Sequence, residues 1–227
     1  MIFDLMQQAV DAVTLSQHPT NKVAALVAGP DFTVTRPNFR PEPINQYFAF
    51  EEKIGNSSGM VHAETAAILA AKHTQGAQIF LTDPPCPNCV KNIAEAGIAH
   101  IYIDHKGFEK DFARRRTQHI DDMSLPLCAH AAIGVSKVFR KEKRVEVLVE
   151  IPKAYKPVVE NPPQLLDLHA GENFKTMIDS AARHYKDQPF ALALAENQDG
   201  KTICICASPH PVIGYTSRTV EQPKDKY

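Results

Sequence analysis

Residues 83–90 of this chain read DPPCPNCV, which places Cys86 and Cys89 three positions apart among three prolines. Two sulfurs at this spacing can reach one ion when a turn or the first turn of a helix holds them. Pro87 suits the first position of a helix, where its missing N–H costs little. A helix that begins there also adds positive potential beside the sulfurs, which favours thiolates. The stretch therefore indicates a rigid turn followed by a helix, with either two metal ligands or a redox dithiol.

A second polar pair lies upstream in VHAETAAIL, where His62 and Glu64 flank Ala63 at the start of a helical pattern. One His and two Cys make three ligands, whereas a structural zinc site uses four, and the sequence has no second Cys-x-x-Cys pair. Three ligands leave the fourth tetrahedral position open for water, as in catalytic zinc sites. Glu64 is placed to take a proton from that water. We therefore expect a catalytic zinc site, with a structural zinc site and a redox pair as the alternatives.

The composition indicates an intracellular globular protein. The chain has 227 residues, of which 44% are hydrophobic, enough for a core in one or two domains. The sequence has no apolar run of the roughly 18 residues that a membrane span needs, and its N-terminus carries acids where a signal peptide carries basic residues. Five cysteines without disulfide-framework spacing fit a reducing, cytoplasmic location. Because 25 basic residues nearly cancel 26 acidic ones, we expect a small-molecule substrate before a nucleic acid, and no membrane partner.

Periodicity predicts alternating helices and strands along residues 1–152, which favours helices packed on a central sheet. An amphipathic helix over 2–16 precedes a hairpin of KVAALVAG and FTVTRP, and a long polar loop over 38–60 should border a site. The pattern then gives, in order, helix HAETAAILAAKH, strand QIFLT, the proline-cysteine turn, helix NCVKNIAEAG capped at Gly97, strand HIYID, a charged helix with FEKDFARRR, an apolar helix LPLCAHAAIG, and strands near 135–139 and 145–151.

The C-terminal third predicts a smaller α+β segment. The stretch PKAYKPVVENPPQLLDLHAGEN carries four prolines and indicates a connector over residues 153–172. Residues 173–227 then predict a helix and a hairpin of FALALAE and KTICICA, with Cys204 and Cys206 on one face of the second strand. This order repeats that of the N-terminus, so the segment is either a degenerate partial repeat or an unrelated packing module.

The two motifs together, His62-Ala63-Glu64 and Pro85-Cys86-Pro87-Asn88-Cys89, resemble those of the zinc-dependent cytidine and deoxycytidylate deaminase superfamily. The resemblance covers about residues 1–140 and includes the opening helix, the hairpin with NKVAALV, and AEAGIAHIYI. It implies a three-layer α/β/α fold with a central mixed sheet. It also implies one Zn2+ per chain, bound by His62, Cys86 and Cys89, and a homo-oligomer.

The resemblance further implies roles for the site residues. Glu64 would move a proton from water to the ring nitrogen and then to the departing amine, while the water oxygen attacks the amino-bearing ring carbon. The resemblance places substrate contacts at Asn38, the Ala63 backbone, and the carbonyls near Pro84 and Pro85; Asn38 has a turn-forming role as its alternative. Candidates for a nucleotide phosphate are Arg114, Arg115 and Arg116, with a solvated helical face as their alternative.

The sequence thus predicts a hydrolase that deaminates a cytosine nucleotide and releases ammonia. The expected substrate is dCMP, converted to dUMP, because EEKIGNSSGMVHAE resembles the loop before the motif in some deoxycytidylate deaminases. The alternatives are a tRNA adenosine deaminase, a guanine, cytosine or nucleoside deaminase, and a catalytically silent regulatory module with the same fold. The near-neutral charge disfavours tRNA binding, and the intact His-x-Glu and Cys-x-x-Cys motifs disfavour a silent module.

Overall fold

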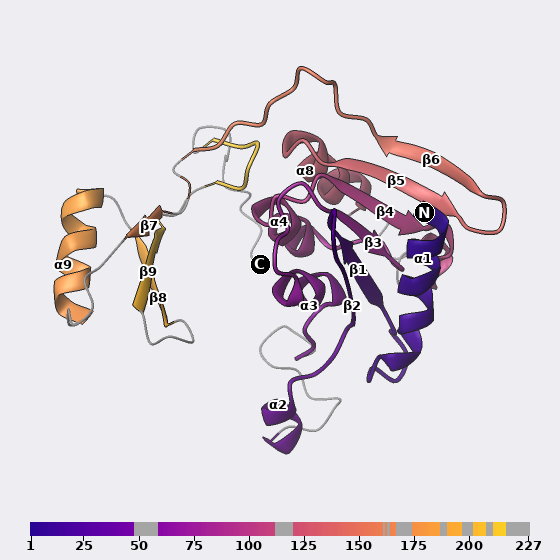
Figure 1. The fold of residues 1–227 in the computed structure, drawn as a ribbon, viewed down its shortest axis with the longest axis horizontal. Helices are drawn as coiled ribbons and strands as arrows, with labels where there is room; N and C mark the ends of the chain where they lie inside the picture. The colour runs from indigo at the N-terminus through magenta and orange to yellow at the C-terminus, as the bar shows by residue number, and fades with distance from the viewer. Residues whose placement is uncertain are drawn as a thin grey trace. The chain divides into compact units, whose positions relative to one another are not determined.

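A six-stranded sheet organises residues 1–156, the first of two units into which the chain divides; the second unit is residues 157–227 (Figure 1). The computed structural model describes residues 1–47, 59–111, 120–160, 162, 164–166, 174–186, 190–196, 202–207 and 211–216. Among the helices of these parts of the chain, none is both long and apolar enough to cross a lipid bilayer.

The sheet of the first unit is mixed. Its strands are β1 (Ala24–Ala28), β2 (Thr33–Pro37), β3 (Gln78–Leu81), β4 (His100–Asp104), β5 (Gly134–Phe139) and β6 (Arg144–Val149), in the order β2-β1-β3-β4-β5-β6. Strands β3, β4 and β5 run parallel, whereas β1, β2 and β6 pair antiparallel. Because Ala25 pairs with Leu81, β1 starts at the edge where the parallel strands end. Sites of open α/β sheets commonly lie at this carboxyl edge.

Helices cover both faces of the sheet. In the described part of the first unit, the helices are α1 (Ile2–Asp11), α2 (Glu42–Tyr47), α3 (Ala63–Ala70), α4 (Pro87–Glu95), α5 (His105–Glu109) and α8 (Leu125–His130), with short helical turns η1 (Ala12–Leu15) and η2 (Ile120–Ser124). Helix α1 lies on one face, and α3 and α4 lie on the other (Figure 1). On the α1 face, Met6 and Ala9 pack against Leu26 and Phe80 in a buried cluster. The expected three-layer α/β architecture with a central mixed sheet is confirmed.

Local sequence explains the ends of α4. Pro87 takes its first position, as predicted, because proline has no N–H to leave unpaired there. At the other end Gly97 adopts a positive φ of 69°, a left-handed conformation that costs glycine little. Its N–H donates to the Ala94 carbonyl oxygen at 2.9 Å, and the Ile98 N–H donates to that of Ile93 at 3.3 Å. This pattern closes the helix and directs the chain into β4.

Several elements differ from the sequence-based expectation. The predicted polar loop over 38–60 contains the short helix α2, and residues 48–58 lie outside the described residues. The charged helix expected around FEKDFARRR begins as α5, which ends at Glu109. Its three arginines lie outside the described residues. Helices of five or six residues complete fewer than two turns, so a 3.6-residue period cannot reveal them.

The second unit is an α+β segment, as expected. It contains α9 (Phe174–Tyr185) and a three-stranded antiparallel sheet of β7 (Gln164–Leu166), β9 (Thr202–Ala207) and β8 (Ala191–Glu196), in the order β7-β9-β8. Met177 and Ala181 of α9 are buried, and Leu192 of β8 packs against them. Strand β7 lies within the segment predicted as a connector. The sequence did not predict it, because three residues beside two prolines give no period-2 signal. The possible repeat stays a prediction, because the two hairpins gain their third strand differently. In the first unit β3 pairs with β1, the first strand of its hairpin, whereas in the second unit β7 pairs with β9, the second strand of its hairpin.

A substitution of Phe80 tests how much the core between α1 and the sheet contributes to stability. Its side chain is fully buried and stacks on Tyr102 with ring centroids 4.8 Å apart. Phe80→Ala should lower the free energy of unfolding by about 3–5 kcal/mol, because it removes contacts and leaves a cavity. Tyr47→Ala is the control, since that side chain is 78% exposed, and it should change stability by less than about 0.5 kcal/mol. Urea unfolding followed by circular dichroism measures both, and equal losses would contradict this account of the core.

Candidate metal centre

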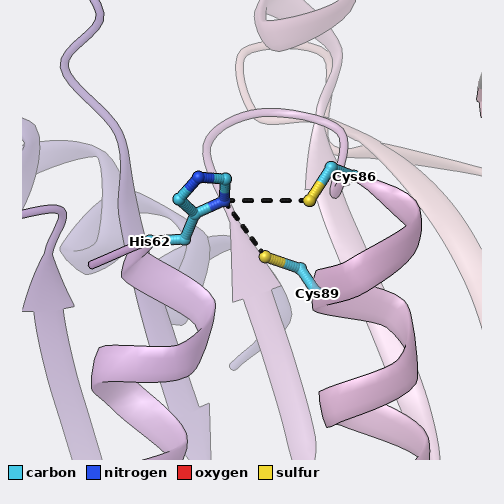
Figure 2. A group of neighbouring side chains, drawn as sticks. All are labelled: His62, Cys86 and Cys89. Carbon is cyan, nitrogen blue, oxygen red and sulfur yellow. Dashed lines mark hydrogen bonds between the residues drawn. The ribbon is translucent and has the colours of Figure 1, made fainter. Parts of the chain in front are cut away.

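Three side chains suited to bind a metal converge at the carboxyl edge of the sheet (Figure 2). The Nδ1 atom of His62 lies 3.2 Å from the Cys89 Sγ atom and 3.8 Å from the Cys86 Sγ atom. All three ligand atoms lie within 4.8 Å of one another. A tetrahedral zinc ion with ordinary bond lengths separates its nitrogen and sulfur ligands by about 3.6 Å. The observed distances lie on either side of this value, so the donor set fits zinc.

The ligands lie at the starts of two helices. His62 is the N-cap residue of α3, and Cys86 is the N-cap residue of α4, with Cys89 in the first turn. The side chain of Asn92 in α4 donates a hydrogen bond to Thr65 Oγ1 in α3 at 3.1 Å, which joins the two helices directly. We refer to residues 61–65 as the His segment and to residues 82–89 as the Cys segment. Both helix N-termini direct positive potential toward the sulfurs, which favours their thiolate form.

The two thiols have different proton affinities. The Cys89 thiol donates a hydrogen bond to the Cys86 sulfur, and this bond lowers the pKa of Cys86 to about 4 although burial opposes the shift. The same bond, together with burial and the nearby Glu64 charge, raises the pKa of Cys89. The hydrogen bond between the two sulfurs therefore favours a pair that carries one negative charge. Binding a metal through both sulfurs must release the remaining thiol proton of the pair.

Glu64 lies in the first turn of α3 and is only 5% exposed. Burial raises the pKa of its carboxyl group to about 6, against backbone hydrogen bonds and the nearby His62, which favour the charged form. Because a thiol carries one hydrogen, the Cys89 thiol can donate either to this carboxyl group or to the Cys86 sulfur. A carboxyl group with a pKa nearer neutrality can both accept and return a proton.

Asn38 is 7% exposed and joins neighbouring segments. Its Oδ1 atom accepts hydrogen bonds from Ser16 Oγ at 2.5 Å and from the Val23 N–H at 3.0 Å. Its Nδ2 atom donates to the Asn21 carbonyl oxygen at 3.0 Å. These bonds use both oxygen lone pairs and one amide hydrogen, so a second amide hydrogen is what Asn38 can offer a substrate.

A short backbone bridge connects the Asn38 segment to the His segment. The Val61 N–H donates to the Phe39 carbonyl oxygen at 2.8 Å, and the Phe39 N–H donates to the Val61 carbonyl oxygen at 3.2 Å. Phe39 follows Asn38 directly, and Val61 precedes His62 directly. Asn38 is therefore held close to the metal ligands. Sequence reasoning missed this bridge, because an isolated residue pair leaves no periodic signal.

The other residues expected to contact substrate have mixed placements. Ala63 is fully buried in the first turn of α3, and Pro84 and Pro85 are buried in the turn before Cys86. The Pro85 carbonyl oxygen accepts a hydrogen bond from the buried Ser124 Oγ at 2.9 Å, which leaves one lone pair for a ligand. Substrate contact by these groups stays a prediction. The phosphate candidates, Arg114, Arg115 and Arg116, lie outside the described residues.

Asp83, three residues before Cys86, forms an ion pair with Lys110, and the sequence did not predict this pair. Asp83 is 3% exposed, and its Oδ2 atom accepts hydrogen bonds from Thr82 Oγ1 at 2.8 Å and from Lys110 Nζ at 2.7 Å. Burial raises the pKa of the Asp83 carboxyl group, and the Lys110 charge opposes this. One feature of the sequence could have pointed to Asp83, because it is an acidic residue between an apolar strand and the proline turn.

The sequence of this chain is similar to that of known proteins. Residues 3–105, which include the two motifs, match the family model described as "Cytidine and deoxycytidylate deaminase zinc-binding region". Over 123 residues the chain is 28% identical to a protein of Aliivibrio fischeri described as "Uncharacterized deaminase in luxG 3'region". The matched stretch covers 53% of this chain and 82% of that relative.

Solved structures also resemble the chain at low identity. The dCMP deaminase of cyanophage S-TIM5 in complex with dCMP and dUMP is 24% identical, covers 59% of this chain and 93% of its own, and gives a TM-score of 0.44. Its apo form is 22% identical, covers 60% and 96%, and gives a TM-score of 0.42. A structure from a study of tRNA:A34 deaminases is 18% identical, covers 44% and 74%, and gives a TM-score of 0.32.

Removing one sulfur should abolish tight zinc binding. Cys86→Ser and Cys89→Ser should each weaken zinc affinity by more than about 100-fold, since changes to groups that merely orient a ligand already cost 10–100-fold. Cys128→Ala is the matched control, because Cys128 is a buried thiol of the same unit outside the cluster. Competition with a chromogenic chelator measures all three affinities. Zinc binding at wild-type strength by Cys86→Ser would remove Cys86 from the ligand set.

Proposed function

Because residues 3–105 match the cytidine and deoxycytidylate deaminase zinc-binding region, we propose that the chain is a cytoplasmic, zinc-dependent hydrolase that converts dCMP to dUMP and ammonia. This match agrees with what the two motifs indicated. The observation that carries the proposal is the buried Glu64 carboxyl group beside a histidine and two cysteines whose spacing fits one zinc ion per chain.

The chemistry divides between the ligands and Glu64. Zinc held by His62, Cys86 and Cys89 supplies activation of water near neutral pH. The Glu64 carboxylate accepts a proton from the attacking water and delivers it to N3 of the cytosine ring. A second proton transfer through the same carboxyl group reaches the amine at C4, so that ammonia leaves as the C4 carbonyl forms. The raised pKa of Glu64 suits both directions of transfer, because neither protonation state is strongly favoured near neutrality.

The proposed base contacts surround the same site. The remaining Asn38 amide hydrogen and the remaining lone pair of the Pro85 carbonyl oxygen supply one donor and one acceptor. The backbone N–H of Ala63 lies in the first turn of α3, where such groups have no partner within the helix. For the 5′-phosphate we propose Arg114, Arg115 and Arg116, since guanidinium groups bind phosphate in bidentate fashion. Assembly as a homo-oligomer belongs to the same proposal.

A substrate panel tests the proposal. The zinc-loaded protein is incubated separately with dCMP, CMP, cytidine, cytosine, guanine and transfer RNA, and ammonia release is measured for each. We expect the highest kcat/KM for dCMP, and a clear loss for the nucleoside, which lacks the phosphate. Equal activity on base and nucleotide would exclude a phosphate contact. Activity confined to transfer RNA, or no activity at all, would replace the proposal with tRNA adenosine deamination or with a silent regulatory module.

Glu64 should be required for turnover and not for metal binding. Glu64→Ala should retain about one zinc per chain and lower kcat by at least about 100-fold, the usual contribution of a positioned acid–base group. Glu150→Ala, which changes an exposed carboxylate of the same unit, is the control and should retain full activity. Zinc content is measured by mass spectrometry and turnover by ammonia release. An active Glu64→Ala enzyme would show that another group moves the proton.

A further inference from the structure

The Asp83–Lys110 ion pair connects three segments that meet beside the metal ligands. Lys110 follows α5, and its Nζ atom donates to Asp83 Oδ2 at 2.7 Å, just after β3. The same Nζ atom lies 3.4 Å from the Lys22 carbonyl oxygen, just before β1. The Lys110 side chain is 43% exposed, whereas that of Asp83 is 4% exposed. The partly exposed lysine thus forms an ion pair with a buried carboxylate.

Residues 21–24 are bonded alternately to the two halves of the site. Asn21 and Val23 bond to Asn38, which leads through the Phe39–Val61 bridge to the His segment. On the other side, Lys22 bonds to Lys110, and the Ala24 N–H donates to Thr82 Oγ1 at 3.0 Å in the Cys segment. The four consecutive residues therefore connect the His segment to the Cys segment.

The ion pair is the charged connection in this network. Thr82 Oγ1 accepts from the Ala24 N–H and donates to Asp83 Oδ2 at 2.8 Å, so the carboxylate fixes the orientation of that hydroxyl group. Gly107 lets α5 approach closely, because a Cβ atom at this position would overlap with the Thr82 carbonyl oxygen. The backbone contact and the Lys110 side chain together restrain the Thr82–Asp83 backbone, which leads through two prolines to Cys86.

We propose that Asp83 and Lys110 are positioning residues that set the distance between the His segment and the Cys segment and thereby the affinity for zinc. The inference rests on the proposed function, since it concerns the same metal site. A zinc site binds tightly only when its ligands are held near their final geometry, so a restraint on the backbone before Cys86 acts on affinity. The competing account is that the pair only stabilises the fold.

The test separates positioning from stability by removing both charges. Lys110→Met alone leaves the Asp83 carboxylate buried without its counter-ion, which is destabilising, whereas Asp83→Asn with Lys110→Met removes the ion pair and keeps the side-chain volumes. Lys110→Arg keeps the charge and the donors. Lys137→Met is the matched control, because Lys137 forms another ion pair of the same unit, with Glu146 at 3.6 Å. Zinc affinity is measured by chelator competition, and folding by thermal unfolding of the zinc-free chains.

The expected result is about a tenfold loss of zinc affinity in the double variant and in Lys110→Met. The double variant should unfold closer to the wild-type temperature than Lys110→Met does. Wild-type affinity is expected for Lys110→Arg and for Lys137→Met. Wild-type affinity in the double variant, or an equal loss in Lys137→Met, would assign the pair to stability alone. If Lys110→Met does not fold, the double variant decides between the two accounts. Wild-type protein that binds zinc but releases no ammonia would refute the proposed function and leave this test intact.

Discussion

The site depends on two helices that start at the same edge of one sheet. Helix α3 runs away from the carboxyl edge, β3 returns to it, and α4 leaves it again, so the chain reverses twice between His62 and Cys89. Both helices pack on the same face of the sheet (Figure 1), and the Asn92–Thr65 hydrogen bond joins them. This path brings an imidazole and two sulfurs within 4.8 Å of one another.

The charge distribution of the site follows from the same path. Two helix N-termini add positive potential beside the two cysteines, where hydrogen bonding lowers the pKa of Cys86, and beside a buried carboxyl group. Burial pushes Glu64 toward its neutral form, and the shared proton between the cysteines limits the negative charge further. A divalent cation would compensate these groups together. Metal binding and the basicity of Glu64 are therefore linked through one electrostatic environment.

The sequence predicted features that depend on residues close together in the chain. Pro87 at the start of α4, Gly97 at its end, and the helix that follows His62 all follow from local backbone preferences. The same reasoning missed the Phe39–Val61 bridge and the Asp83–Lys110 pair, since each joins residues more than twenty positions apart. Propensity and periodicity describe single elements, whereas such contacts depend on how the elements pack. Asn38 illustrates the limit, because its position was identified but its hydrogen bonds to Ser16, Asn21 and Val23 were not.

The close backbone contact at Gly107 constrains how this protein can change during evolution. A Cβ atom there would overlap with the Thr82 carbonyl oxygen, and that oxygen belongs to the main chain, so no rotamer change relieves the conflict. Every possible missense mutation of this codon would push α5 outward. The position is thus intolerant of variation for a purely steric reason, and the displacement would reach the backbone that leads to Cys86, although Gly107 itself is no metal ligand.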